Sequence, residues 1–230
     1  MELTIFVKLV CEEWVAMIGN IDKLYERLEA NMDNRVWWDT ENPWEIVVGA
    51  ILVQNTNWKN VDYSLDNIRE DIGFVPEKLA AIDILELQEL IRPSGFYKNK
   101  SRALKEIFAW FETYNFDIAA IQQKDLPSLR EELLSIRGIG QETADVLLIF
   151  VFNKVTFIAD RYAQRIFNQL GLEETLNYSK LQAMIKLPTD FTNQQAQNFH
   201  GWLVDYGQIH LKSEEAWEAG FLSDFELELV

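Results

Sequence analysis

Several features that would define a protein class are scarce or missing in this chain of 230 residues. Its single cysteine, Cys11, excludes an intramolecular disulfide and any cluster held by four cysteines. No apolar run reaches the roughly 18 residues of a membrane span, so we expect no contact with a membrane. Residues 1–10 carry Glu2 and Lys8 and lack both the basic start and the cleavage site of a signal peptide.

Basic residues are in the minority, because 21 lysines and arginines stand against 37 aspartates and glutamates, for a net charge of −16. Proteins that bind nucleic acid usually present a basic face to the phosphates. The charge is unevenly spread: residues 92–105 hold five basic side chains and no acidic one, whereas residues 213–230 hold six carboxylates and no basic one. We therefore expect a basic strip on an acidic body. The strip would also include Arg130, Arg137, Lys154, Arg161 and Arg165.

Helical periodicity extends along most of the chain, with short polar connections between the helices. Asn42-Pro43 has the pattern of an N-cap followed by proline in the first turn. The only β-branched run, residues 154–158, is short. We therefore predict an all-α protein. The predicted helices span residues 21–31, 44–54, 61–69, 76–81, 84–91, 100–114, 162–170, 178–186 and 193–212, with two more in 126–152.

The most informative segment lies between the two helical patterns of residues 126–152. Gly138 and Gly140 separate these patterns, and glycine permits positive φ and a close approach by another backbone. The second helix begins directly after Gly140, so its unpaired N–H groups can bind an anion such as a phosphate. Asp160 follows 20 residues after Gly140, beyond an apolar helix and a short loop.

This segment resembles the helix-hairpin-helix of the endonuclease III superfamily of DNA glycosylases, the HhH-GPD family. Residues 95–101 (Gly-Phe-Tyr-Lys-Asn-Lys-Ser) and 52–56 (Leu-Val-Gln-Asn-Thr) resemble two further motifs of this family, in family order. The resemblance covers residues 35–210. It implies a two-lobed helical fold with a central cleft. One lobe would comprise residues 35–160, and the other would combine residues 1–34 with 161–230.

Within the family, the chain is most similar to the small 3-methyladenine DNA glycosylases that lack an iron–sulfur cluster. The shared features are Trp37-Trp38, Trp58 and the segment 92–97, Arg-Pro-Ser-Gly-Phe-Tyr. Cleavage of an N-glycosidic bond builds positive charge on the sugar, which a nearby carboxylate can stabilise. The resemblance assigns this role to Asp160, while the plain alternative is a helix cap. For Asp145, on the helix after the hairpin, we expect a solvated or capping role.

Glu142 is a specific departure from part of the family. The bifunctional glycosylase/lyases carry lysine here, and its amine forms a Schiff base with the sugar. Glutamate cannot do so, and the resemblance therefore implies a monofunctional enzyme that leaves an abasic site. Alternatively, Glu142 is an acid in the first turn of a helix, where the helix dipole favours it.

Aromatic and polar residues complete the predicted site. Enzymes that act on a base extrude it and hold it between aromatic faces, and an alkylated, cationic base gains further from cation–π contact. The base pocket would contain Trp37, Trp38 and Trp58, unless these tryptophans only pack in the core. The DNA contacts would come from Gln54, Asn55, Lys98, Lys100, Gly138, Gly140 and Gln141. Polar helix ends and a solvated surface are the alternatives.

We therefore predict a monofunctional DNA glycosylase that excises a damaged base, an N-alkylated purine by preference, from duplex DNA. The rival hypothesis is a catalytically inactive or differently specific helix-hairpin-helix DNA-binding protein. We expect no cofactor and no metal site, because His200 and His210 are ten residues apart without a third ligand. We expect a monomer in the bacterial cytoplasm, associated with the nucleoid, with Cys11 in the core.

Overall fold

The computed structural model describes residues 16–34, 37–172 and 176–230. The expectations for residues 1–10 and for Cys11 lie outside these ranges. Within them the chain is helical without a β-strand, and only an isolated bridge joins Ile18 to Leu229. The predicted all-α class is therefore confirmed. The helices are α1 (Ile21–Asn31), α2 (Pro43–Leu52), α3 (Trp58–Asp71), α4 (Pro76–Ala81), α5 (Ile84–Leu90), η1 (Arg92–Ser94), α6 (Tyr97–Glu112), α7 (Ile118–Gln122), α8 (Leu126–Ser135), α9 (Gln141–Phe150), α10 (Arg161–Gln169), α11 (Tyr178–Met184), α12 (Asn193–His210) and α13 (Glu214–Glu218).

Two clusters of buried hydrophobic side chains organise these helices. The first is built from α2 to α9 and includes residues 38–152 of the chain. The second combines α1 with α10 to α13 and residues 157–159. Burial of these apolar side chains is the main force that holds each cluster together. Because residues 157–159 pack in the second cluster, we propose a lobe boundary between residues 152 and 157 instead of at residue 160.

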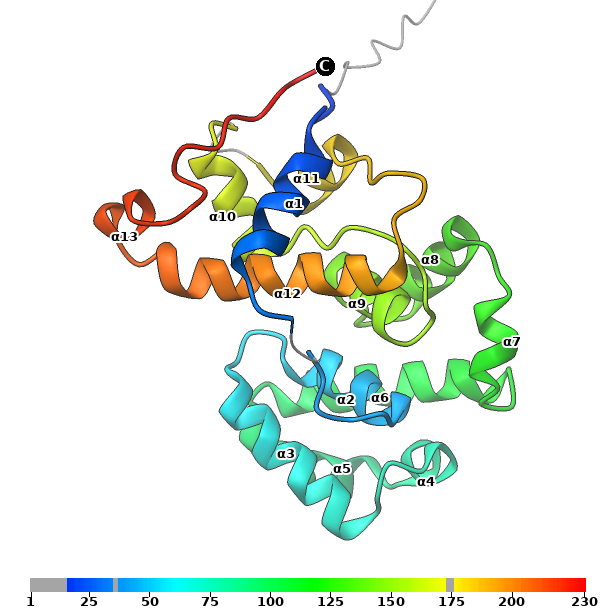
Figure 1. Cartoon of the computed structure of the whole chain (residues 1–230). Coiled ribbons are helices and arrows are strands. Elements are labelled where there is room, and N and C mark those ends of the chain that lie inside the picture. Colours follow the sequence, from blue (N-terminus) through cyan, green and yellow to red (C-terminus); the bar gives the residue numbers. More distant parts are fainter. Residues whose placement is uncertain (1–15, 35–36, 173–175) are drawn as a thin grey trace, which may run out of the picture.

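Helix α9 lies where the two clusters meet. Val146 and Phe150 pack against both clusters, and α9 contacts α2 on one side and α12 on the other. In Figure 1 the C-terminal lobe lies above the helices α2 to α6, with α9 beside α12. The second helix of the hairpin is therefore the shared wall of the two lobes.

The two hairpin glycines have different structural roles. Gly138 adopts φ +94°, and a Cβ atom there would lie 2.7 Å from the Cβ of Ala103 on α6. This position therefore needs glycine for both its conformation and its packing. Gly140, in contrast, has φ −90° as the N-cap of α9, and a Cβ atom there would meet nothing within 4 Å. The fold itself does not require a glycine at residue 140.

Lys100 holds the end of α2 in place. Its ammonium group donates to the carbonyl oxygens of Leu52 (2.8 Å) and Ser94 (2.6 Å). The residue is 3% exposed, and burial lowers the pKa of its amine to about 8. Its side chain therefore satisfies a carbonyl at the C-terminal end of α2, just before the turn that carries Gln54 and Asn55.

Candidate active site

Asp160 is both a helix cap and a buried acid. Its Oδ1 accepts a hydrogen bond from the backbone N–H of Ala163 (2.8 Å), which makes it the N-cap of α10. The residue is 6% exposed, and burial raises the pKa of its carboxyl to about 6, although backbone hydrogen bonds act against this rise. A role as helix cap is therefore compatible with a role as catalytic carboxylate, because the cap uses Oδ1 and the carboxylate also has a second oxygen, Oδ2.

The second oxygen of Asp160 faces His200 on α12. Asp160 Oδ2 lies 3.9 Å from His200 Nδ1. Burial lowers the pKa of His200 to about 4, so the imidazole is neutral at physiological pH and leaves the carboxylate charge unbalanced. The sequence contains no signal for this pair, because the two residues are 40 positions apart and neither belongs to a ligand pattern.

Glu142 lies in the first turn of α9 and lines a cavity of about 650 Å³. Its neighbours there include Gln54 and Asn55 from the end of α2 and Tyr178 from α11. Partial burial by the cavity walls, reinforced by the negative charge of Asp160, raises the pKa of Glu142 to about 7. The side chain itself remains accessible from the cavity. The two acids are therefore close enough to influence each other's charge.

Gln54 joins the two walls of this cavity. Its Nε2 donates to Thr143 Oγ1 at 2.8 Å, which connects the end of α2 to the start of α9. Asn55 follows with φ 53° and an exposed side chain, and asparagine tolerates this left-handed conformation better than most residues. Gly140 and Gln141 line the same cavity, so the structure brings together the predicted polar residues of the hairpin and of the turn after α2.

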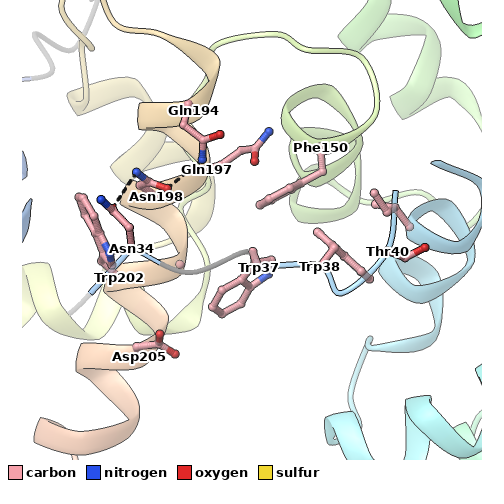
Figure 2. A pocket seen from close by; sticks show the side chains of 12 residues that line it. Asn34, Trp37, Trp38, Thr40, Phe150, Gln194, Gln197, Asn198, Trp202 and Asp205 are labelled. Atoms are coloured by element: carbon pink, nitrogen blue, oxygen red, sulfur yellow. Dashed lines mark hydrogen bonds between the residues drawn. The ribbon is translucent and has the colours of Figure 1, made fainter. Parts of the chain in front are cut away.

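A second cavity, of about 440 Å³, contains the aromatic residues (Figure 2). Trp37, Trp38 and Phe150 line one part of it, and amide side chains of α12 line another. Asp205 contributes a carboxylate, and no lysine or arginine belongs to the described lining. The lining consists of Asn34, Trp37, Trp38, Thr40, Ile46, Phe150, Gln194, Gln197, Asn198, Gly201, Trp202 and Asp205.

The three predicted pocket tryptophans differ in their surroundings. Trp37 is half-buried and packs its ring on Gly201 and edge-on against His200, with ring centroids 5.5 Å apart. Trp38 is 8% exposed, belongs to the first core cluster and packs tightly on Gly49. Trp58 meets Trp38 edge-on at 5.1 Å and lines a neighbouring cavity instead of the one with Phe150.

His200 connects the acids with the aromatic cavity. Its ring contacts both Trp37 and Phe150, with the Phe150 centroid 6.1 Å away, and its Nδ1 faces Asp160. A planar group held beside Trp37 would therefore be one imidazole ring away from the buried carboxylate. This arrangement suits an enzyme that holds a base in one compartment and stabilises charge on the attached sugar in the next.

The comparisons with known proteins agree with this geometry. Residues 48–189 match the family model described as HhH-GPD superfamily base excision DNA repair protein. The chain belongs to this superfamily. It is therefore a DNA glycosylase of base excision repair, similar to endonuclease III, and DNA is its binding partner.

The relatives of this glycosylase cover most of its length. A protein of Methanocaldococcus jannaschii named as a DNA repair glycosylase is 37% identical over 191 residues, which is 81% of this chain and 86% of that protein. Endonuclease III of Sulfolobus acidocaldarius is 28% identical over 178 residues, covering 76% and 77% of the two chains.

Solved structures show the same fold. The 3-methyladenine DNA glycosylase MagIII of H. pylori, bound to 1,N6-ethenoadenine, superposes with a TM-score of 0.68 and 26% identity, covering 82% of this chain and 96% of that one. A non-covalent endonuclease III–DNA complex has a TM-score of 0.67 at 21% identity and covers 85% and 88% of the two chains.

The structure corrects the prediction for Lys100. We expected both Lys98 and Lys100 to contact DNA, and both lie in the first turn of α6, which begins at Tyr97. Lys98 is exposed, whereas the Lys100 amine is buried on backbone carbonyls and cannot reach a phosphate. The sequence places Lys100, but not Lys98, four residues before Leu104 on the apolar face of the helix, yet it does not reveal the carbonyl oxygens that receive the amine.

Several side chains of the predicted basic strip bind groups of the protein itself. Arg92 forms an ion pair with Glu89, and Lys105 donates to carbonyl oxygens of Ala80 and Ile82. Arg130, Lys154 and Arg165 likewise bind groups of the protein. Within the predicted strip, the exposed cations with no hydrogen bond or ion pair to the rest of the described chain are Lys98, Arg102, Arg137 and Arg161.

Asp145 also differs from its predicted role, because it is fully buried instead of solvated. Arg130 binds both of its oxygens, with Nε–Oδ1 2.8 Å and an Nη2–Oδ2 distance of 3.0 Å. Tyr178 and Gln182 of α11 each donate to Oδ2 at 2.7 Å. This network ties both helices of the hairpin to the second lobe, and all its polar groups come from distant parts of the chain.

Phe96 is an exposed aromatic residue, close to the predicted DNA-contacting lysines in the sequence, to which we assign no role from the sequence. It is 66% exposed and adopts φ 46° as the N-cap of α6. It lies two residues after Ser94, whose carbonyl shares the Lys100 ammonium with the end of α2. The sequence feature that points to an exposed aromatic side chain here is its position directly after Gly95 in a polar segment.

Two further properties concern cofactors and membranes. Among residues 16–34, 37–172 and 176–230, no three His, Cys, Asp or Glu side chains come together as metal ligands. Over the same ranges, none of the helices has the length and hydrophobicity needed to cross a membrane.

Proposed function

We propose that this glycosylase is monofunctional and releases N-alkylated purines from duplex DNA, leaving an abasic site. The observation that carries the first part is Glu142, which takes the position of the Schiff-base lysine of the bifunctional enzymes and opens into the cavity beside Asp160. A carboxylate has no nitrogen with which to form an imine. Hydrolysis by water then remains as the way to complete the reaction.

The aromatic cavity supports the proposed lesion. Trp37 and Phe150 offer ring surfaces to an extruded base, and no lysine or arginine belongs to the described lining. These rings favour a cationic alkylated purine through cation–π attraction. Such a base is already activated as a leaving group, so no acid is needed to protonate it.

Asp160 would supply the charge stabilisation. Its second oxygen and the neutral His200 place a largely buried negative charge beside the compartment of the base. In surroundings with little water this charge acts more strongly on a sugar cation than it would at the surface.

The contacts to DNA would come from the hairpin and α6. The open space at Gly140 allows a phosphate to approach the N–H groups at the start of α9. Lys98, Arg102 and Arg137 are exposed, and the last two flank the contact between Gly138 and Ala103. We propose that the protein acts as a monomer on chromosomal DNA in the cytoplasm, at the nucleoid.

The test measures base release together with strand cleavage. Duplexes that contain 7-methylguanine should lose the base, and their strands should stay intact until alkali is added. Borohydride should trap no covalent complex. A trapped complex would contradict the monofunctional assignment, and no base release from any lesion would support the rival, catalytically inactive DNA-binding protein.

A different lesion is the second candidate. The MagIII structure contains 1,N6-ethenoadenine, a base without a fixed positive charge, and the amides of Gln194, Gln197 and Asn198 can donate and accept hydrogen bonds on a neutral base. Parallel duplexes with an etheno, a deaminated and an oxidised base distinguish the two. Faster release of a neutral base than of 7-methylguanine would replace the alkylated purine.

A further inference from the structure

Glu142 has an accessible carboxylate that the fold does not use. Within the described chain no hydrogen bond or ion pair holds it. It lines the 650 Å³ cavity between the end of α2 and α11, with Gln54 and Tyr178 as neighbours. An accessible acid without a structural partner is free to exchange protons with a molecule in the cavity.

Asp160 is poorly suited to take a proton during the reaction. Its Oδ1 accepts from the N–H of Ala163, the N–H of Tyr162 is a further donor to the carboxylate, and Oδ2 lies opposite His200. Protonation would remove the negative charge at the moment when the sugar carries its positive charge. Charge stabilisation and proton transfer are therefore better divided between two carboxylates.

We propose that Glu142 is a second catalytic residue, the general base that removes the proton from the attacking water. The inference rests on the proposed monofunctional hydrolysis. The C1′–N bond breaks, and its electron pair leaves with the base. The water oxygen bonds to C1′, and its proton passes to the Glu142 carboxylate and later to solvent. Asp160 keeps its charge throughout, and no oxidation or reduction takes place.

The electrostatics of the cleft favour this role. The raised pKa of Glu142, about 7 instead of 4.5, makes its carboxylate a stronger base than an ordinary glutamate. Only the ionised form can accept a proton. Base release should therefore increase as pH rises through about 7 and reach a plateau above it.

The test compares Glu142→Gln with Glu131→Gln, which removes the same charge from an exposed position on α8. Single-turnover release of 7-methylguanine is measured from pH 5.5 to 9 on the full chain, with circular dichroism to verify folding. Glu142→Gln should lower the plateau rate by about 100-fold or more and remove the rise in rate near pH 7, so that only the rise near pH 6 from ionisation of Asp160 is left. Glu131→Gln should retain both the rate and the rise near pH 7.

The outcomes separate this inference from the proposed function. A wild-type protein that releases no base contradicts the proposed function itself. An active wild type whose Glu142→Gln variant keeps the rate and the rise near pH 7 contradicts only the role of Glu142. A wild-type rate that falls with rising pH through the same range would make Glu142 an acid and overturn the inference. Glu142→Asp should recover part of the rate with the rise near pH 7 still present.

Discussion

The carboxylate of Asp160 lies 3.9 Å from the imidazole of His200, and both side chains are buried. Burial disfavours the charged form of each group, so it shifts their pKa values in opposite directions. Burial raises the pKa of the acid to about 6 and lowers that of the histidine to about 4. At neutral pH the pair therefore consists of an aspartate anion and an uncharged imidazole. The anion is costly for the fold and useful for a cationic transition state.

Asp160→Asn should abolish activity and stabilise the protein. An asparagine oxygen can still cap α10, whereas an amide cannot balance charge on the sugar, so we expect base release to fall by about 100-fold or more. Single-turnover kinetics with 7-methylguanine duplexes measure this effect. A variant with the wild-type rate would show that Asp160 is only a cap.

The stability change follows from the raised pKa. The folded carboxyl titrates at about 6 instead of 3.8, so the folded state holds its proton more tightly, and stability is lost as pH rises through this window. The charge then costs up to roughly 3 kcal/mol at pH 8. Chemical denaturation should show Asp160→Asn to be more stable than the wild type at pH 8, with the difference disappearing by about pH 4.

The two hairpin glycines should respond differently to alanine. Gly138→Ala places a methyl group 2.7 Å from Ala103 at φ +94°, so we expect a loss of stability of about 1–3 kcal/mol. Gly140→Ala meets no protein atom and should leave the melting temperature nearly unchanged. If a phosphate approaches residue 140, the methyl group should nevertheless weaken DNA binding. Unchanged affinity in Gly140→Ala would place the DNA elsewhere.

Lys98 and Lys100 provide a second comparison, between an exposed and a buried lysine in the first turn of α6. Lys98→Ala removes an exposed cation, so the dependence of log affinity on log salt should decrease by about one, with stability unchanged. Lys100→Met leaves the carbonyls of Leu52 and Ser94 without their donor and should cost about 1–3 kcal/mol of stability. Salt titrations of DNA binding and thermal melts measure the two effects. An unchanged slope in Lys98→Ala would mean that DNA does not cross the start of α6.

Substitution of Trp37 and of Trp38 should have different effects on stability and on base release. Trp38→Ala opens a cavity in the first core and should cost about 3–5 kcal/mol of stability. Trp37→Ala should cost less stability and slow the release of a cationic base by about 10- to 100-fold, with a smaller effect on a neutral base. Melts and kinetics on both lesion types provide the comparison. If neither variant alters selectivity, the support for an alkylated substrate is lost.

The local features of this protein were readable from its sequence. Helices 21–31 and 76–81 were predicted with their observed bounds, and the N-cap at Asn42 accepts a hydrogen bond from Trp44 as its pattern indicates. The helix bounds and the cap depend on residues a few positions apart, so helical periodicity and capping are sufficient to predict them. The hairpin glycines and Asp160 were instead recognised through the resemblance of their segment to the HhH-GPD family.

The environment of each charged side chain was decided by the tertiary structure alone. Lys98 is solvated, whereas Lys100 buries its amine against a carbonyl 48 residues away in the sequence, a partner that only the packing of α6 on α2 supplies. Asp145 receives its partners from α8 and α11, and Asp160 meets His200 from α12. Burial and charge pairing are set by which helices pack together, and this packing is a property of the whole chain that no local pattern contains.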